Sequence, residues 1–102
     1  MVTEIARIEI DPARAAEFEA AVAQAEPYFR ADKGCTGFAL ERVVETPGTY
    51  HLIVGWTSVE AHLEGFRGSP AFQVWRALSS PFFLEPPHVV HMERVIGTVT
   101  VT

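Results

Sequence analysis

The chain has 102 residues, of which 48% are hydrophobic and 21% are charged, a composition typical of one folded globular domain. Its net charge is −5, from 13 acidic and 8 basic residues that are spread along the chain. Because no basic cluster is present, the composition argues against a nucleic-acid interface and against binding to an anionic membrane surface.

Cysteine usage and hydropathy exclude two further classes of protein. Cys35 is the only cysteine, so neither an internal disulfide nor a multi-cysteine zinc site is possible. No apolar run approaches the roughly 20 residues of a membrane span, and no basic-then-apolar leader precedes the first periodic segment. We therefore expect a cytoplasmic protein without a membrane partner.

The first two elements are predicted to be a strand and a helix. Residues 2–10 alternate well enough to form a β-strand. Asp11 and Pro12 then supply a helix cap and a first-turn proline. The apolar side of this helix recurs at steps of four, three and four: Phe18, Val22, Ala25 and Phe29. Pro27 is expected to bend or end the helix, because it lacks an amide donor and crowds the preceding turn.

A β-hairpin should follow. Residues 36–45 form its first predicted strand, and residues 46–49, Thr-Pro-Gly-Thr, place proline and glycine for a tight turn. Residues 50–56 then return antiparallel to the first strand. One face of the return strand carries Tyr50, Leu52, Val54 and Trp56.

A broken helical arm comes next. Thr57 and Glu60 fit a capping box for a short helix. Two glycines interrupt it, and Ser69 and Pro70 supply a new cap and first-turn proline, so a second helix is predicted over residues 70–79. Its apolar face comprises Phe72, Trp75, Leu78 and Phe82.

The last strand is predicted over residues 88–96. The order β-α-β-β-α-β is that of the ferredoxin-like α+β fold, a four-stranded antiparallel sheet with both helices on one face. Residues 1–96 would make up this domain. Residues 97–102 form a β-prone tail that is free to pair with the sheet edge of a partner subunit.

The strands are expected to carry apolar residues on both sides, although helices cover only one. The pairs that indicate this are Ile5 opposite Ile8, Phe38 opposite Leu40, and Val89 opposite Val90. A second copy of the chain would bury the bare face. We therefore predict a homodimer in which two sheets close into a dimeric α+β barrel.

Several motifs carry a family resemblance: Gly55-Trp56, Ser58-x-Glu60-Ala61-His62, Gly65-Phe66-Arg67-x-Ser69-Pro70-x-Phe72-x-x-Trp75-Arg76, and Pro87-x-Val89-x-His91. In these motifs, and in the order of its elements over nearly the whole chain, the sequence resembles the antibiotic biosynthesis monooxygenase family of dimeric α+β barrels. The same superfamily also includes isomerases, haem-degrading enzymes, quinol oxidases and stress-responsive proteins, so the fold alone does not fix the reaction.

The resemblance implies cofactor-independent oxygenation of an electron-rich aromatic small molecule, such as an anthrone or a quinol. Molecular oxygen would be the co-substrate, and the substrate would bind between the sheet and the helices. Oxygenases of this kind often use an asparagine with a tryptophan, whereas this chain has no asparagine. Its haem-degrading relatives ligate haem through a histidine at the position where this chain has Arg76, so haem chemistry is not expected.

His62 and His91 are the candidates for proton transfer, because a neutral imidazole is the most natural base near pH 7. The alternatives are a solvent-facing helix residue for His62 and a hydrogen-bonded interface residue for His91. Arg67 is the candidate for binding an anionic group, or else an ion-pair partner of a nearby glutamate.

Aromatic side chains are the candidates for the walls of a substrate pocket, since small-ligand sites are mostly apolar. They are Trp56, Phe66, Phe72 and Trp75, with Tyr50 as a further phenol donor. All of them would also serve as ordinary core residues.

Two other functions stay open. One is an isomerase or lactone-handling enzyme that uses the same base without oxygen. The other is a small-molecule-binding or stress-response dimer that catalyses no reaction.

Overall fold

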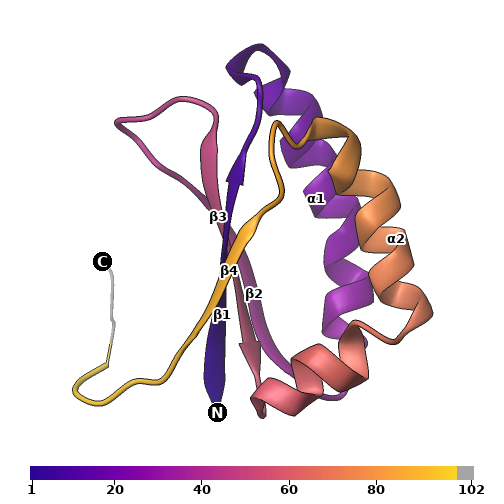
Figure 1. Cartoon of the computed structure of the whole chain (residues 1–102), viewed down its shortest axis with the longest axis vertical. Coiled ribbons are helices and arrows are strands. Elements are labelled where there is room, and N and C mark those ends of the chain that lie inside the picture. The colour runs from indigo at the N-terminus through magenta and orange to yellow at the C-terminus, as the bar shows by residue number, and fades with distance from the viewer. Residues whose placement is uncertain (99–102) are drawn as a thin grey trace.

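A four-stranded antiparallel sheet in the order β2-β3-β1-β4 carries the helices on one face, which confirms the predicted ferredoxin-like α+β fold (Figure 1). The strands are β1 (Val2–Glu9), β2 (Cys35–Arg42), β3 (Thr49–Trp56) and β4 (His88–Met92). The computed structural model describes residues 1–98. Most of the predicted tail, residues 97–102, therefore lies outside the described residues.

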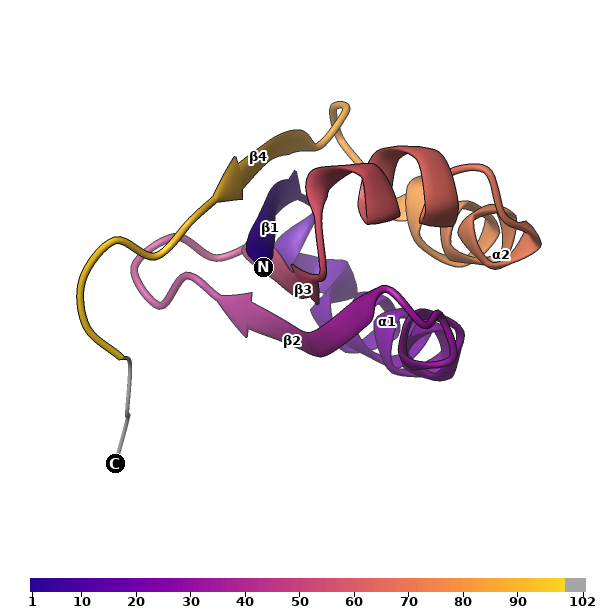
Figure 2. The ribbon, with the colours of Figure 1, turned by 90° about the horizontal axis from the view of Figure 1, so that it is seen from below.

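Two main helices form the second layer, as Figure 2 shows from below. They are α1 (Ala15–Arg30) and α2 (Pro70–Ser79), with three short helical segments, η1 (Pro12–Arg14), η2 (Ala61–Phe66) and η3 (Ser80–Phe82). The core lies between the layers, where α1 buries Phe18, Val22, Ala25 and Phe29. None of the described helices has the length and hydropathy needed to cross a membrane.

The start of α2 follows its predicted capping chemistry. The Ser69 hydroxyl oxygen accepts a hydrogen bond from the amide of Phe72 at 3.4 Å, and Pro70 occupies the first turn. The capping box expected for the preceding helix is wrong. Ser58 caps it instead, because its hydroxyl oxygen accepts from the amide of Ala61 at 3.0 Å.

Pro27 does not end α1, which continues to Arg30. The proline lies in the last turn, where its missing N–H removes only one helical hydrogen bond. Its own carbonyl accepts from the amide of Ala31 at 3.0 Å, and Phe29 beyond it is only 2% exposed, so core packing holds the last turn in place.

The last strand is shorter than predicted, ending at Met92 rather than at residue 96. Met92 pairs with Thr3, and β1 begins at Val2, so almost no partner strand remains beyond this point. The prediction that Phe38 and Leu40 lie on opposite faces is also wrong. They are two residues apart in β2, so both side chains lie on the face that the helices cover.

The other face of the sheet carries an apolar row that crosses all four strands. Strand register places its members side by side: Ala39, Ile53, Ile5 and Val90. Val90 is 53% exposed. A polar row runs beside it and comprises Glu41, His51, Arg7 and His88. The described residues thus leave an apolar stripe on the sheet without a covering layer.

Candidate active site

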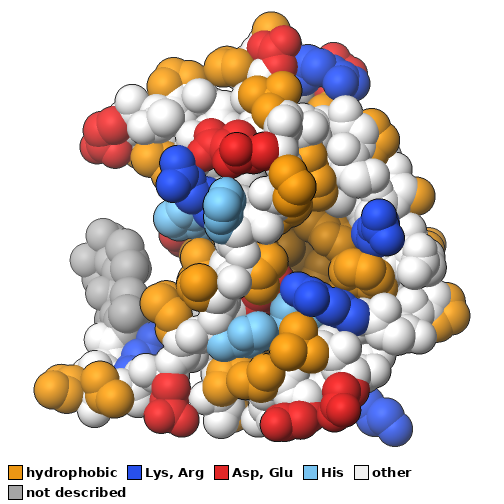
Figure 3. All heavy atoms as spheres, in the orientation of Figure 1, with side chains coloured by type: hydrophobic (Ala, Val, Ile, Leu, Met, Phe, Trp, Pro, Cys, Tyr) orange, Lys and Arg blue, Asp and Glu red, His pale blue; other side chains and the backbone are white. Residues whose placement is uncertain are grey.

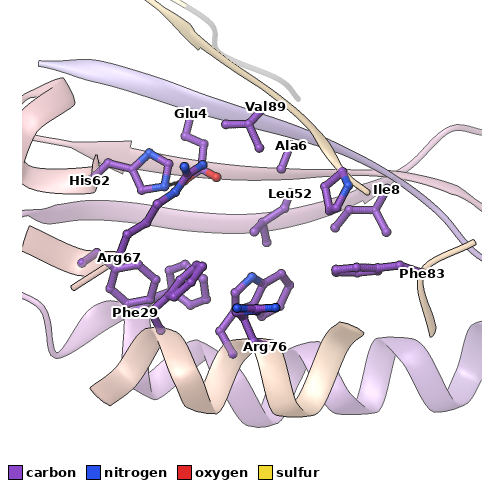
Figure 4. A pocket seen from close by; sticks show the side chains of 14 residues that line it. Glu4, Ala6, Ile8, Phe29, Leu52, His62, Arg67, Arg76, Phe83 and Val89 are labelled. Carbon is purple, nitrogen blue, oxygen red and sulfur yellow. Dashed lines mark ion pairs between the residues drawn. The ribbon is translucent and has the colours of Figure 1, made fainter. Parts of the chain in front are cut away.

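A cavity of about 200 Å³ lies between the sheet and the helical layer, and Figure 4 looks into it. Much of its wall is apolar and includes Ile8, Leu52, Phe66, Phe72, Trp75 and Phe83. Its ionisable lining residues are Glu4, His62, Arg67 and Arg76. In the space-filling view, a hollow lined with hydrophobic side chains opens to the surface beside basic groups (Figure 3). An apolar chamber with a few polar groups is the usual form of a small-molecule site.

The helical segment η2 has π-helical geometry, which places two of the lining residues in the interior. The amide of Arg67 donates to the carbonyl of His62, five residues earlier, at 3.0 Å. His62 and Phe66 are buried as a result, with exposed fractions of 2% and 1%. Single π-turns of this kind are frequent at functional sites.

Rings pack behind and around the cavity. Phe66 stacks on Phe29 with ring centroids 4.5 Å apart, and Phe72 meets Phe66 edge-on at 5.9 Å. Trp75 meets Phe29 edge-on at 5.3 Å. These contacts restrict the rings to defined orientations, so the wall is largely formed before any ligand binds.

Glu4, Trp56, His62 and His91 form a polar cluster at one end of the cavity. Glu4 Oε1 accepts a hydrogen bond from Trp56 Nε1 at 2.9 Å, and the same oxygen lies 3.3 Å from His62 Nε2. His62 Nδ1 is hydrogen-bonded to His91 Nε2 at 2.8 Å. Trp56 stacks on the His62 ring at 5.1 Å with an interplanar angle of 8°, so the imidazole is held on several sides.

Burial shifts the acid–base properties of this cluster. It raises the pKa of the Glu4 carboxyl, against the opposing effects of the Trp56 hydrogen bond and the positive charge of Arg67. Burial also lowers the pKa of His62 to about 4, and the charges of Arg67 and His91 act in the same direction. His62 is therefore a neutral imidazole near pH 7. Groups with shifted pKa values in a cavity are candidates for proton transfer.

Arg67 and Arg76 line the cavity while their side chains remain exposed. Figure 4 shows Arg67 extending toward Glu4 and His62. The ion pair expected between Arg67 and a nearby glutamate does not form, because neither arginine makes a salt bridge within residues 1–98. Both guanidinium groups are thus available to an anionic ligand. No set of three or more metal-ligating side chains is grouped in the same residues.

The model of the antibiotic biosynthesis monooxygenase family matches residues 1–78, more than half of the chain. The chain belongs to this family. Among solved structures, a Bordetella bronchiseptica protein that bears the family's name is 47% identical, with a TM-score of 0.90 over 93% of this chain and 97% of that one. The uncharacterized protein YczJ of Bacillus subtilis is 39% identical over 95 residues, which are 93% of this chain and all of YczJ.

More distant members of the antibiotic biosynthesis monooxygenase family share the fold. A Caulobacter crescentus structure with the family's name has a TM-score of 0.81 at 24% identity, covering 93% of this chain and 90% of that one. At that identity the likeness shows the architecture alone. The family name therefore supports the fold of this chain, whereas the reaction has to be argued from the cavity.

Most of the site residues predicted from the sequence line the cavity. Its lining includes His62, Phe66, Arg67, Phe72 and Trp75. The solvent-facing alternative for His62 is excluded by its burial.

The other three predicted site residues do not line the cavity. His91 reaches it only through His62. Trp56 is fully buried beneath the His62 ring, so it supports the site rather than forming its wall. Tyr50 is not placed to act as a phenol donor to the cavity, because its hydroxyl donates to Glu19 Oε2 at 2.6 Å.

Sequence reasoning missed Glu4, the acidic residue of the cavity. It shares the inward face of β1 with Ala6 and Ile8 and is only 5% exposed. The signal was present, since a carboxylate at a position that alternates with apolar core residues requires a compensating partner. The partners, Trp56 and His62, lie more than fifty residues away along the chain, so the pattern of β1 alone could not identify them.

Proposed function

We propose that this protein is a cofactor-independent monooxygenase that acts on an electron-rich aromatic or quinol-type small molecule. The observation that carries the proposal is the cavity itself. Packed rings line it, a buried carboxyl–imidazole cluster lies at one end, and its wall includes two arginines that have no ion-pair partner within residues 1–98. Such a site can bind an aromatic ring, move a proton and stabilise an oxyanion in one place.

The substrate itself would supply the electrons for the reaction with oxygen. Removal of a proton from an activated CH₂ group, which a naphthol or quinol carries in its keto tautomer, leaves a delocalised anion, which donates one electron to O₂ and then combines with the resulting superoxide. The new C–O bond gives a hydroperoxide, whose O–O bond breaks with loss of water to leave a ketone. One oxygen atom enters the product and the other enters water, so no further reductant is required.

Each part of the cavity has a role in this chemistry. His62 and His91 belong to the cluster that handles the proton, and Arg67 faces the oxyanion of the activated substrate. Phe66, Phe72 and Trp75 hold the aromatic ring and exclude water from the reactive anion.

The size of the cavity favours a small substrate. Its volume of about 200 Å³ is below the range of roughly 300–1,000 Å³ that is usual for drug-sized ligands. We therefore expect a compound with one or two fused rings, such as a naphthol or naphthoquinol, to bind better than a three-ring anthrone.

The working unit in this proposal is a homodimer. The apolar row that includes Ile5, Ile53 and Val90 has no covering layer among the described residues, and a second copy would bury it. Sedimentation of the wild type and of Ile53→Glu tests this point. A dimer that becomes a monomer in the variant supports it, whereas a wild-type monomer contradicts it.

Oxygen consumption with a panel of one-, two- and three-ring phenols and quinols tests the proposed reaction. The expected result is uptake of one O₂ per product formed, with a strong loss in His62→Ala and full activity in His88→Ala, which removes an exposed histidine of β4. Conversion of the same compounds under nitrogen would instead indicate an isomerase. Binding without conversion would indicate a non-catalytic protein.

A further inference from the structure

We propose that Oε2 of Glu4 is the atom that takes the proton from the substrate, and that His62 and His91 act by holding this carboxylate in place. This inference rests on the proposed function, which it deepens by assigning the base. The two carboxylate oxygens of Glu4 have different surroundings.

The first oxygen, Oε1, is committed to the protein. Trp56 Nε1 can only donate, so Oε1 must be the acceptor of that 2.9 Å hydrogen bond. A proton on the carboxyl group is therefore expected on Oε2. Whether the group is ionised or neutral, the titrating oxygen is the one that Trp56 leaves free.

The second oxygen is open to the cavity. Within residues 1–98, Oε2 accepts no hydrogen bond, and yet no buried polar side-chain atom in that range is left without a partner. Oε2 therefore cannot be sealed in the interior. Since Glu4 is 5% exposed and lines the cavity, the space that Oε2 reaches is the cavity itself.

His62, in contrast, has no ring nitrogen with a free lone pair. His62 Nε2 lies 3.3 Å from Glu4 Oε1, which already accepts a hydrogen bond from Trp56. If Nε2 carried no proton, its lone pair would face a lone pair of that oxygen, so we assign the ring proton to Nε2. Nδ1 is then unprotonated and accepts from His91 Nε2 at 2.8 Å. With Nε2 protonated and the Nδ1 lone pair bonded to His91, His62 cannot accept the substrate proton, and its ring lies against Glu4. His91 fixes the tautomer of His62.

The surroundings of Glu4 favour a stronger base than an ordinary carboxylate. The polar groups that act on Glu4 or lie near it come from four parts of the fold: Trp56 on β3, His62 and Arg67 in the η2 region, His91 on β4 and the Cys35 thiol on β2. Burial is the largest influence and raises the pKa of the carboxyl group. A pKa closer to neutrality increases the driving force for proton abstraction.

The proposed step balances without a further proton donor. The substrate C–H proton moves to Oε2, and the electron pair stays on carbon, which reacts with O₂ as described above. The neutral carboxylic acid then returns its proton to the distal oxygen of the resulting peroxide. Loss of the second C–H proton and of the distal oxygen as water leaves the ketone and regenerates the carboxylate.

The kinetic test is Glu4→Gln, in which the amide oxygen still accepts from Trp56. We expect kcat to fall by about 10²–10⁴-fold, the usual contribution of a general base, while KM changes less than about threefold. Glu19→Gln is the matched control, because it removes a carboxylate bonded to the buried Tyr50 away from the cavity. A Glu4→Gln variant with the wild-type rate overturns the assignment.

Chemical rescue separates a base from a structural carboxylate. In Glu4→Ala, added formate should restore part of the lost rate, because it supplies a carboxylate to the vacated space. His91→Leu should lower kcat by on the order of tenfold or more through loss of the correct His62 tautomer, and His91→Gln, which can still donate to Nδ1, should recover most of it. A loss in Glu4→Ala that formate leaves unchanged, in a variant with native circular dichroism, contradicts the proposal.

A binding measurement without oxygen tests proton transfer to Glu4 independently of the oxygenase reaction. The probe is 4-nitrophenol under nitrogen, whose phenolate absorbs visible light. The wild type should bind it with transfer of its proton to Glu4, seen as phenolate absorbance together with a new infrared band of a protonated carboxyl group. Glu19→Gln should behave in the same way, and Glu4→Gln should lack the infrared band.

The two kinds of failure then differ. If the wild type consumes no oxygen with any compound but shows the carboxyl band, the proposed function fails and Glu4 remains the base of the cavity. If the wild type does not bind or does not ionise the probe, or if Glu4→Gln retains the band, the assignment of Glu4 is wrong.

Discussion

Replacement of His62 by Gln should make the stability of the protein less sensitive to acid. The pKa of His62 is lowered from 6.5 to about 4, by burial first and then by the charges of Arg67 and His91. Below pH 6.5 the unfolded chain therefore binds a proton that the folded chain excludes. The free energy of unfolding falls as the pH decreases through this window and levels off near the folded pKa.

The magnitude follows from the two pKa values. With about 1.36 kcal/mol per pKa unit, acidification from pH 7.5 to pH 5 should remove about 2 kcal/mol of stability through His62. The cavity beside the ring opens to the surface, so solvent should screen the charge, and the measured effect should be in the range of about 1–2 kcal/mol. Glu4 contributes with the opposite sign, because its pKa is raised, and it is present in both proteins.

Urea unfolding of the wild type and of His62→Gln at these two pH values measures the difference. Gln can accept from His91 and lie against Glu4, so the polar contacts of the cluster persist. All samples should have the same protein concentration, because the stability of an oligomer depends on it. His88→Gln is the control and should follow the wild type, since His88 is exposed. A His62→Gln profile parallel to that of the wild type would refute the reasoning.

Three other substitutions test separate parts of the structure. Trp56→Phe should lower the free energy of unfolding by about 2 kcal/mol, because the buried Glu4 carboxylate loses a hydrogen bond. Urea titration measures this, and an unchanged urea midpoint would contradict the geometry of the cluster. Gly48→Ala should lower the free energy of unfolding by about 1–3 kcal/mol, since Gly48 has φ 88° and an added Cβ would collide with the Ile10 carbonyl. Gly65→Ala is the control and should not destabilise, because an added Cβ there meets no atom of residues 1–98 within 4 Å. Arg67→Ala should weaken calorimetric binding of a naphthoate at least about tenfold, without a similar loss for the uncharged naphthalene methanol.

Local chemistry predicted the start of α2 but not that of the preceding helix, where Ser58 and not Thr57 is the cap. Ser69 and Pro70 place the start of α2 correctly, because a cap and a first-turn proline act within one turn. The end of the last strand was misplaced, because it is set by where β1 begins rather than by the β-propensity of residues 93–96.

The candidate site was predictable only in part, for a related reason. The aromatic and histidine motif around residues 62–75 is contiguous in sequence, and most of it does line the cavity. The π-turn that buries His62 and the carboxylate of Glu4 depend on contacts between distant segments. Tyr50 is predicted to be a phenol donor to the pocket, but its hydroxyl donates to Glu19, thirty-one residues away in the chain.

Isotopic labelling of oxygen tests the central claim most directly. A naphthoquinol or naphthol that the wild type consumes should be incubated with labelled O₂ in unlabelled water, and the product analysed by mass spectrometry. We predict one labelled oxygen atom in the product and one labelled water per turnover, with labelled product forming about 10²–10⁴-fold more slowly in Glu4→Gln. A product without label would show that the cavity does not catalyse oxygen insertion, whereas equal rates of labelled product from the two proteins would show that Glu4 is not the base.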